Sequence, residues 1–133
     1  MTKHENPPGP TGELSLRVLA MPADTNPSGH IFGGWVLGQM DIAGGMHAVS
    51  HSGLMTATVA VDAMQFHRPV FVGDEVSCYT RIIRVGRTSV AVQVETWVRR
   101  HRHGEALLVT EGLFTYVAVD NKGQPIEIPN KDI

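Results

Sequence analysis

The chain has 133 residues, of which 42% are hydrophobic and 18% charged, and its formal net charge is −2. This length and composition predict one globular domain and exclude a disordered chain. The small net charge gives no general attraction to nucleic acid or to an anionic membrane, so we expect neither as a partner. The single cysteine, Cys78, excludes an internal disulfide, and no apolar run reaches the ~20 residues of a membrane-spanning helix. Because the polar, Pro-rich N-terminus does not look like a signal peptide, we expect a soluble, cytoplasmic protein.

The predicted elements begin after a flexible lead-in of residues 1–12. Residues 14–21 alternate between apolar and polar side chains as a strand does, and residues 22–29 form a loop rich in turn residues. A helix is predicted from about residue 33 to residue 50. Because this helix is apolar almost all round, we expect the rest of the molecule to enclose it.

A series of strands follows the helix, with turn residues between them. The predicted strands are 56–61, 64–72, 75–85, 89–99 and 107–119. Gly73-Asp74, Gly86-Arg87 and His103-Gly104 lie where hairpin turns are expected. The fold class is therefore α+β, with an antiparallel sheet of five or six strands wrapped around one long helix. We expect this domain to span residues 13–129, followed by a short tail of residues 130–133.

The start of the predicted helix carries the most informative residues. Gly33 and Gly34 leave backbone N–H groups bare at a helix N-terminus, which suits a developing oxyanion. Asp41 lies about two turns further on, ~10 Å along the axis, and is the one charge in an apolar helix. A carboxylate in that setting costs stability unless it is paired or used, so we interpret Asp41 as a general base or a nucleophile.

Asn26 lies in the loop before the helix, where its amide can orient a water molecule or a substrate carbonyl. Structural alternatives stay open for each of these residues. Asn26 is also a common turn residue, and Gly33-Gly34 also permits close packing. Asp41 is compatible with a helix kink or with pairing to a buried arginine.

Six pieces of the sequence, in order, resemble hotdog-fold acyl-CoA thioesterases of the YciA and brain acyl-CoA hydrolase type. They are MPADTNPSGHIFGGW at 21–35, QMDIAGG at 39–45, MQFHRPVFVGDEV at 64–76, GRTSVAVQVETWV at 86–98, EGLFTYVAVD at 111–120 and GQPIEIP at 123–129. The resemblance covers residues 16–129 and implies a hotdog fold. It also implies hydrolysis of acyl-CoA to a free fatty acid and coenzyme A, a step in fatty acid metabolism.

The resemblance further implies a homo-oligomer, with a dimer as the minimum and a trimer of dimers (a homohexamer) as the full assembly. Asn26 and Gly33 of one subunit would then act with Asp41 of the partner subunit. The turn Gly86-Arg87-Thr88-Ser89 offers a guanidinium and two hydroxyls to coenzyme A, although a solvated turn is the alternative. Arg68 is a further candidate for a phosphate contact or for holding the dimer. No cofactor is expected, because coenzyme A is part of the substrate.

Other signals predict less. His47 and His51 have a zinc-compatible spacing, but no third ligand follows from the sequence, so we expect no metal site. The basic run at residues 99–103 fits a solvated hairpin tip, and the alternative is contact with the 3′-phosphate of coenzyme A across an oligomer. The alternative function is a non-hydrolytic or dehydratase-type hotdog protein that binds acyl-CoA or acyl carrier protein, but Asp41 together with Asn26 favours hydrolysis. Five flexible or aromatic side chains fit either an acyl tunnel or the core: Met40, Met46, Met55, Met64 and Phe66.

Overall fold

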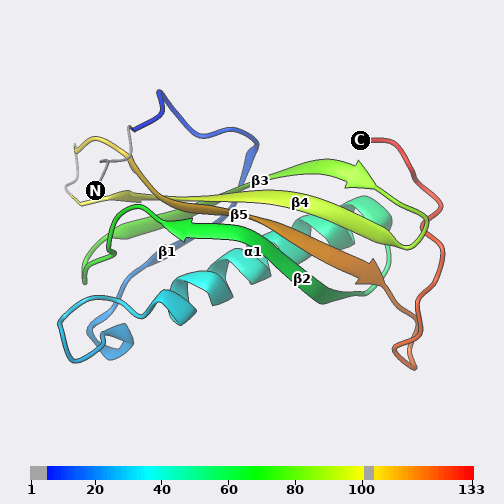
Figure 1. Cartoon of the computed structure of the whole chain (residues 1–133), viewed down its shortest axis with the longest axis horizontal. Coiled ribbons are helices and arrows are strands. Elements are labelled where there is room, and N and C mark those ends of the chain that lie inside the picture. The colour runs from blue at the N-terminus through cyan, green and yellow to red at the C-terminus, as the bar shows by residue number, and fades with distance from the viewer. Residues whose placement is uncertain (1–5, 101–103) are drawn as a thin grey trace.

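The computed structural model describes residues 6–100 and 104–133. Residues 1–5 of the predicted lead-in lie outside the described residues, as do residues 101–103 of the predicted basic run and its adjoining turn. The elements are β1 (Glu13–Leu19), the short 3-10 helix η1 (Pro22–Asp24), α1 (Gly33–Ser52), β2 (Thr56–Phe66), β3 (Glu75–Val85), β4 (Ser89–Arg99) and β5 (Leu107–Ala118) (Figure 1).

The strands form one five-stranded sheet in the order β1-β3-β4-β5-β2, and every neighbouring pair is antiparallel. Helix α1 runs along one face of this sheet and contacts all five strands (Figure 1). The predicted α+β class, with a sheet curved around one long helix, is therefore confirmed. Because β2 follows α1 but pairs with β5, the chain crosses the sheet twice, and β1 and β2 become its edges.

Helix α1 ends where Gly53 adopts a left-handed conformation (φ 71°) and donates its N–H to the carbonyl of Val49. The expectation that this helix is enclosed is wrong for the single chain. Ile42, Met46 and Val49 are exposed, because one sheet covers only one side of a helix. The side that faces the sheet consists mostly of small or slender residues: Val36, Met40, Ala43, Gly44, Ala48 and Ser52.

Strand β2 differs from the prediction of two short strands at 56–61 and 64–72. One strand runs through to Phe66, with an irregular register between Asp62 and Gln65 where Ala63 has a positive φ of 51°. Residues 67–74 are a connection rather than a strand, because Pro69 has no N–H to donate to a ladder. This connection pairs instead with the loop before α1, since the N–H of Ile31 donates to the carbonyl of Val70.

The predicted hairpin turns have two different outcomes. Gly86-Arg87 does connect neighbouring strands, and the N–H of Gly86 donates to the carbonyl of Ser89. Gly73-Asp74 is not a hairpin turn, because the strands on either side of it, β2 and β3, are not adjacent in the sheet. Asp74 is instead a buried side chain that accepts the N–H of Phe71 at 2.9 Å and lies 3.5 Å from Nε of Arg100.

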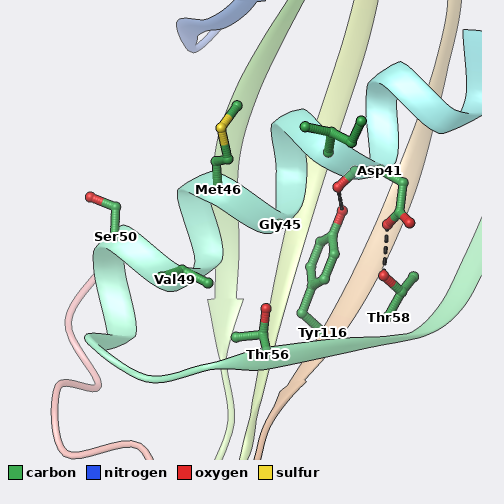
Figure 2. Close-up of a pocket in the computed structure, with 9 residues that line it drawn as sticks. Asp41, Gly45, Met46, Val49, Ser50, Thr56, Thr58 and Tyr116 are labelled. Atoms are coloured by element: carbon green, nitrogen blue, oxygen red, sulfur yellow. Dashed lines mark hydrogen bonds between the residues drawn. The ribbon is translucent and has the colours of Figure 1, made fainter.

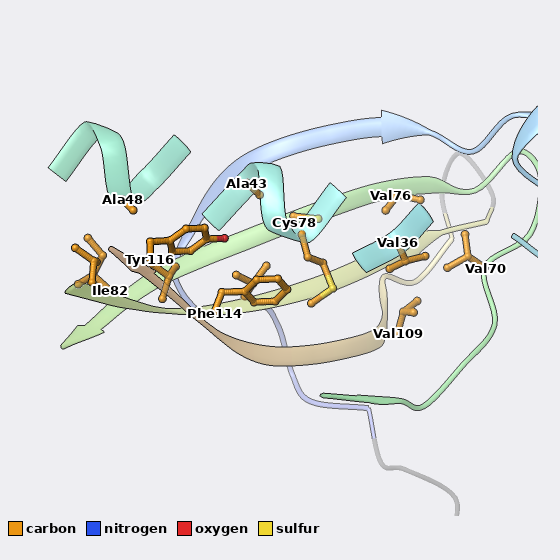
Figure 3. Close-up of a cluster of buried hydrophobic side chains, with 14 of the residues drawn as sticks. Val36, Ala43, Ala48, Val70, Val76, Cys78, Ile82, Val109, Phe114 and Tyr116 are labelled. Atoms are coloured by element: carbon orange, nitrogen blue, oxygen red, sulfur yellow. The ribbon is translucent and has the colours of Figure 1, made fainter. Parts of the chain in front are cut away.

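The core lies between α1 and the concave face of the sheet and consists largely of valine, with two aromatic residues at its centre (Figure 3). Phe114 and Tyr116 of β5 are both buried and lie nearly parallel, with ring centroids 6.4 Å apart. Cys78 is buried in the same cluster, and burial raises the pKa of its thiol to about 11, so it stays a neutral thiol. Among the described residues, no helix has both the length and the apolar character needed to cross a membrane.

From Asn6 onward, the segment before β1 makes hydrogen bonds to the start of β5 and to β4. The side chain of Asn6 donates to the carbonyl of Ala106 at 3.1 Å and accepts the N–H of Leu108 at 3.0 Å. Thr11 donates its hydroxyl to the carboxylate of Glu95 at 2.6 Å. The domain boundaries at residues 12 and 129 stay a prediction.

Candidate active site

Asp41 lies halfway along α1, on the wall of a cavity of ≈ 440 Å³ between the helix and the β2 edge of the sheet (Figure 2). The lining is mainly apolar, apart from one carboxylate and several hydroxyls. It consists of Asp41, Ile42, Gly45, Met46, Val49, Ser50, Thr56, Thr58 and Tyr116. We refer to this cavity as the Asp41 pocket. A long apolar group attached to a polar reacting centre fits such a lining.

The Asp41 carboxylate is half-buried and is held by a strand rather than by a cation. The hydroxyl of Thr58, on β2, donates to Oδ1 of Asp41 at 2.7 Å (Figure 2). Within the described residues, the ion pairs do not include Asp41. The structural alternative of a buried arginine partner is therefore not what the structure shows. Among the hydrogen bonds of the described residues, the other carboxylate oxygen has no donor, which leaves it available to accept a proton or to attack.

Tyr116, on β5, contacts the same turn of the helix from the side that faces the sheet. Its hydroxyl donates to the backbone carbonyl of Asp41 at 2.9 Å. Burial raises the pKa of the Tyr116 phenol above its ordinary value, and the nearby charge of Asp41 raises it further. The phenol therefore stays neutral and acts as a donor.

Two glycines on α1 face Tyr116, and one of them makes this approach possible. A Cβ at Gly44 would overlap the Tyr116 hydroxyl and would lie 3.1 Å from two ring carbons. A Cβ at Gly45 would lie 3.5 Å from the ring, which is ordinary contact. Of the pair, Gly44 is thus the position at which a larger residue forces the helix and Tyr116 apart.

A second cavity, of ≈ 350 Å³, lies at the N-terminal end of α1. We refer to it as the Asn26 pocket. Its lining combines predicted site residues with polar residues from the connection after β2: Asn26, His30, Ile31, Gly33, Val36, Phe66, His67, Arg68, Pro69 and Val70. The structure therefore brings Asn26, Gly33 and Arg68 together, but in a cavity that does not include Asp41.

The Asn26 side chain serves as both a turn residue and a potential donor. Its Oδ1 accepts the N–H of Ser28 at 3.0 Å, the hydroxyl of Ser28 at 2.7 Å and the N–H of His30 at 3.1 Å. Among the described residues, its Nδ2 group donates no hydrogen bond. The oxygen is thus committed to the loop, while the amide N–H groups can donate to a ligand.

The helix N-terminus next to Asn26 offers further donors. Phe32 is the N-cap residue, its side chain makes no capping hydrogen bond, and its carbonyl accepts the N–H groups of Trp35 and Val36. The N–H groups of Gly33 and Gly34 have no acceptor among the hydrogen bonds of the described residues, as expected for the first groups of a helix. A Cβ at Gly34 would meet open space, so a ligand can approach the backbone closely there.

The turn that contains Gly86, Arg87, Thr88 and Ser89 lies far from Arg68 within one chain. Ser89 pairs with Val117 at one end of the β4–β5 ladder, whereas the Arg68 guanidinium donates to the carbonyl of Leu108 at the other end. This turn also holds the C-terminal segment, because the carbonyl of Arg87 accepts the N–H of Ile128 at 2.8 Å. One chain therefore does not bring the two groups of predicted coenzyme A residues together.

The family of this chain follows from comparison with known proteins. A family model described as the thioesterase superfamily matches residues 28–104. The acyl-CoA thioester hydrolase YciA of Escherichia coli is 49% identical over 123 residues, which cover 90% of this chain and 93% of that protein. This chain belongs to the thioesterase superfamily.

Solved structures of thioesterases share the fold. A hexameric broad-specificity acyl-coenzyme A thioesterase superposes with a TM-score of 0.87 at 45% identity, covering 93% of this chain and 86% of that one. A hexameric hotdog fold thioesterase of Campylobacter jejuni has a TM-score of 0.82 at 43% identity and covers 88% and 90%. The hotdog fold and the family resemblance predicted from the sequence are both confirmed.

His47 and His51, the two histidines with a zinc-compatible spacing, do not form a metal site with Asp41. Nδ1 of His47 lies 2.8 Å from the hydroxyl of Thr80, and its Nε2 lies 3.2 Å from the carboxylate of Glu13. His47 and His51 line a different cavity from Asp41. Within the described part of the chain, no three His, Cys, Asp or Glu residues are grouped so as to hold a metal ion.

No pattern in the sequence singles out Thr58 or Tyr116, although both contact Asp41. A signal was present in the Gly44-Gly45 pair, because two glycines inside a helix often mark a close approach. The partner in that approach was not readable, since it requires knowing that β5 lies beneath this turn. Of the five candidate tunnel residues, Met46 lines the Asp41 pocket, Phe66 lines the Asn26 pocket and Met40 belongs to the core.

Proposed function

We propose that this protein is an acyl-CoA thioester hydrolase in which Asp41 is the catalytic carboxylate. The observation that carries the proposal is a carboxylate with one uncommitted oxygen on the wall of a mainly apolar cavity. The proposal is supported by YciA, an acyl-CoA thioester hydrolase that is 49% identical to this chain. The products are a carboxylic acid and the free thiol of coenzyme A.

The reaction needs a nucleophile at the thioester carbonyl and donors for the oxygen that becomes negative. Asp41 takes a proton from a water molecule that attacks the carbonyl, or attacks directly and forms an anhydride that water then opens. In either route the C–S bond breaks, the sulfur leaves as a thiolate and it gains a proton from solvent. Amide N–H groups of Asn26 and backbone N–H groups of Gly33 or Gly34 stabilise the oxyanion.

These groups act together if the site is shared between two subunits. Within one chain, Asp41 lies in one pocket and the donors lie in another. The exposed side of α1 and the edge strand β2 carry the apolar residues Ile42, Met46, Val49, Val59 and Val61. Pairing of two copies through this surface covers those residues and the open edge of the sheet. We take the dimer as the minimal active unit and, from similarity to hexameric thioesterases, propose a trimer of dimers.

The same pairing accounts for the two separated groups of coenzyme A residues. If a two-fold axis across α1 relates the two copies, their α1 helices lie antiparallel. Opposite ends of the two chains are then close together. The Gly86–Ser89 turn of one chain then lies near the Arg68 end of the other. We propose that Arg87, Thr88 and Ser89 bind the phosphates or the pantetheine arm of coenzyme A, and that Arg68 contributes from the partner side.

The proposed reaction uses water and groups of the protein, so we propose that no cofactor takes part. A dehydratase-type function has no support, because His47 contacts Glu13 and Thr80 instead of lining the Asp41 pocket. We also propose a cytoplasmic location, since the one cysteine is a buried free thiol of the kind that reducing compartments maintain.

The test is release of free thiol from a panel of acyl-CoAs, from acetyl to palmitoyl. Asp41→Asn removes the base or nucleophile while leaving the donors, so we expect kcat to fall by about 10²- to 10⁴-fold with little change in affinity for coenzyme A. The matched control is Asp132→Asn, an exposed carboxylate near the C-terminus, which should keep wild-type kcat. An Asp41→Asn enzyme with most of its kcat intact would show that Asp41 is structural.

A further inference from the structure

Two residues on neighbouring strands contact Asp41 from different directions. Thr58 on β2 and Tyr116 on β5 are paired directly across the ladder between these strands. Thr58 holds the carboxylate, whereas Tyr116 holds the backbone of the same residue (Figure 2). A hydrogen bond to the carboxylate limits rotation of the side chain. The position of the carboxylate also depends on the backbone that carries it, so a contact with the backbone adds a second constraint.

Tyr116 is suited to fix that backbone. Tyr116 is 1% exposed and its ring lies nearly parallel to that of Phe114, so the hydroxyl has little freedom to move. The Asp41 carbonyl, to which it donates, belongs to the helix turn that carries the carboxylate. Gly44 leaves the space that this contact needs.

We propose that Tyr116 is a positioning residue for catalysis, and that its contact with the Asp41 carbonyl across Gly44 sets the depth of the carboxylate in the pocket. This inference rests on the proposed role of Asp41. Catalysis is sensitive to such placement, because a base displaced by a fraction of an ångström loses its alignment with the attacking water. Binding of coenzyme A depends on other residues, so the contact affects kcat and not KM.

The first experiment removes the hydroxyl alone. Tyr116→Phe keeps the ring and its packing, and we expect kcat to fall by about 3- to 10-fold, the scale of one hydrogen bond, with KM unchanged. Tyr79→Phe is the matched control: it removes another tyrosine hydroxyl, one that contacts Arg17, and should leave kcat unchanged. A Tyr116→Phe enzyme that is less stable to heat but has wild-type kcat would mean that the hydroxyl is merely structural, and would overturn the proposal.

The second experiment asks whether Tyr116 acts through Asp41. In an Asp41→Asn enzyme there is no carboxylate to position, so adding Tyr116→Phe should leave the residual kcat unchanged. An equal fall in both backgrounds would mean that Tyr116 acts elsewhere and would overturn the inference, while leaving the role of Asp41 intact. If Asp41→Asn itself has no effect, the proposed function fails first, and the inference fails with it.

The third experiment tests the close approach from the helix side. Gly44→Ala places a methyl group where the Tyr116 hydroxyl lies, so we expect kcat to fall more than in Tyr116→Phe. The double variant Gly44→Ala with Tyr116→Phe removes the worst overlap, so its kcat should rise above that of Gly44→Ala alone. Gly9→Ala is the control for an added methyl group, because a Cβ there meets nothing within 4 Å and Gly9 lines neither pocket. Independent, multiplicative effects of the Gly44 and Tyr116 changes would contradict a shared contact.

Discussion

The two pockets beside α1 differ in the chemistry that they present. The Asp41 pocket has a carboxylate and an apolar wall but no backbone N–H donors from a helix end. The Asn26 pocket has amide and helix N-terminal donors, and Arg68, but Asp41 is not part of its lining. The proposed hydrolysis needs both sets, so we propose that each pocket is half of a site. One chain therefore contains the proposed catalytic groups without bringing them together.

The donor half is tested by Asn26→Ala, for which we expect the largest effect among the following variants. The change removes an oxyanion donor and also the three hydrogen bonds that Oδ1 accepts from its loop. We expect kcat to fall by about 10²- to 10³-fold, measured by thiol release. Ser28→Ala controls for the loop, since it removes only one of those hydrogen bonds. An equal fall in Ser28→Ala would assign the effect to loop geometry rather than to the amide.

The separation of the two halves is tested by mixing inactive subunits. If Asn26 and Asp41 serve one site from opposite chains, a mixed dimer of Asn26→Ala and Asp41→Asn carries both lesions in one site and leaves the other intact. Random exchange makes about half of the dimers mixed, so roughly a quarter of wild-type activity should return, a gain of tens of fold over either variant alone. Mass spectrometry verifies that the subunits have exchanged. If no activity returns after verified exchange, the model of a shared site is wrong.

Much of the fold and part of the candidate site follow from local sequence. The start of α1 at Gly33, the lone acid Asp41 and the turn at Gly86 are properties of short segments, and the structure places them as predicted. The strand predicted at 64–72 was wrong because the apolar pattern continues past Phe66, although Pro69 stops the ladder. An apolar pattern does not distinguish a strand from a connection that packs against another loop.

The rest of the site depends on strand order, which no local pattern contains. Tyr116 meets Asp41 only because β5 lies in the sheet beside β2, and Thr58 meets it only because β2 crosses to the edge. The exposed side of α1 has a similar explanation. Its apolar residues indicate burial, but the sequence does not say whether the same chain or a second copy provides it.

The Asp41 pocket and the turn of residues 86–89 should also bind different parts of the substrate. Arg87 lies in the exposed turn that we assign to coenzyme A, so Arg87→Ala should raise KM by about 10-fold through loss of a charge-assisted contact. The increase should be the same for every acyl chain, because all acyl-CoAs share this part. Arg84→Ala, a nearby exposed arginine on β3, is the control. An increase that depends on chain length would place Arg87 at the acyl group instead.

The smallest effect is expected on the acyl side, at Met46. This side chain lines the Asp41 pocket, and Met46→Ala enlarges the space beside the carboxylate. We expect the ratio of kcat/KM for palmitoyl-CoA to that for butyryl-CoA to rise about 3-fold, since changes in an apolar pocket discriminate weakly between chain lengths. Met55→Ala is the matched control, because Met55 is exposed and does not line the pocket. Inhibition by free coenzyme A should not change in either variant. If Met46→Ala weakens that inhibition and leaves the ratio unchanged, the Asp41 pocket takes the coenzyme and not the acyl chain, and the assignment of the two halves must be reversed.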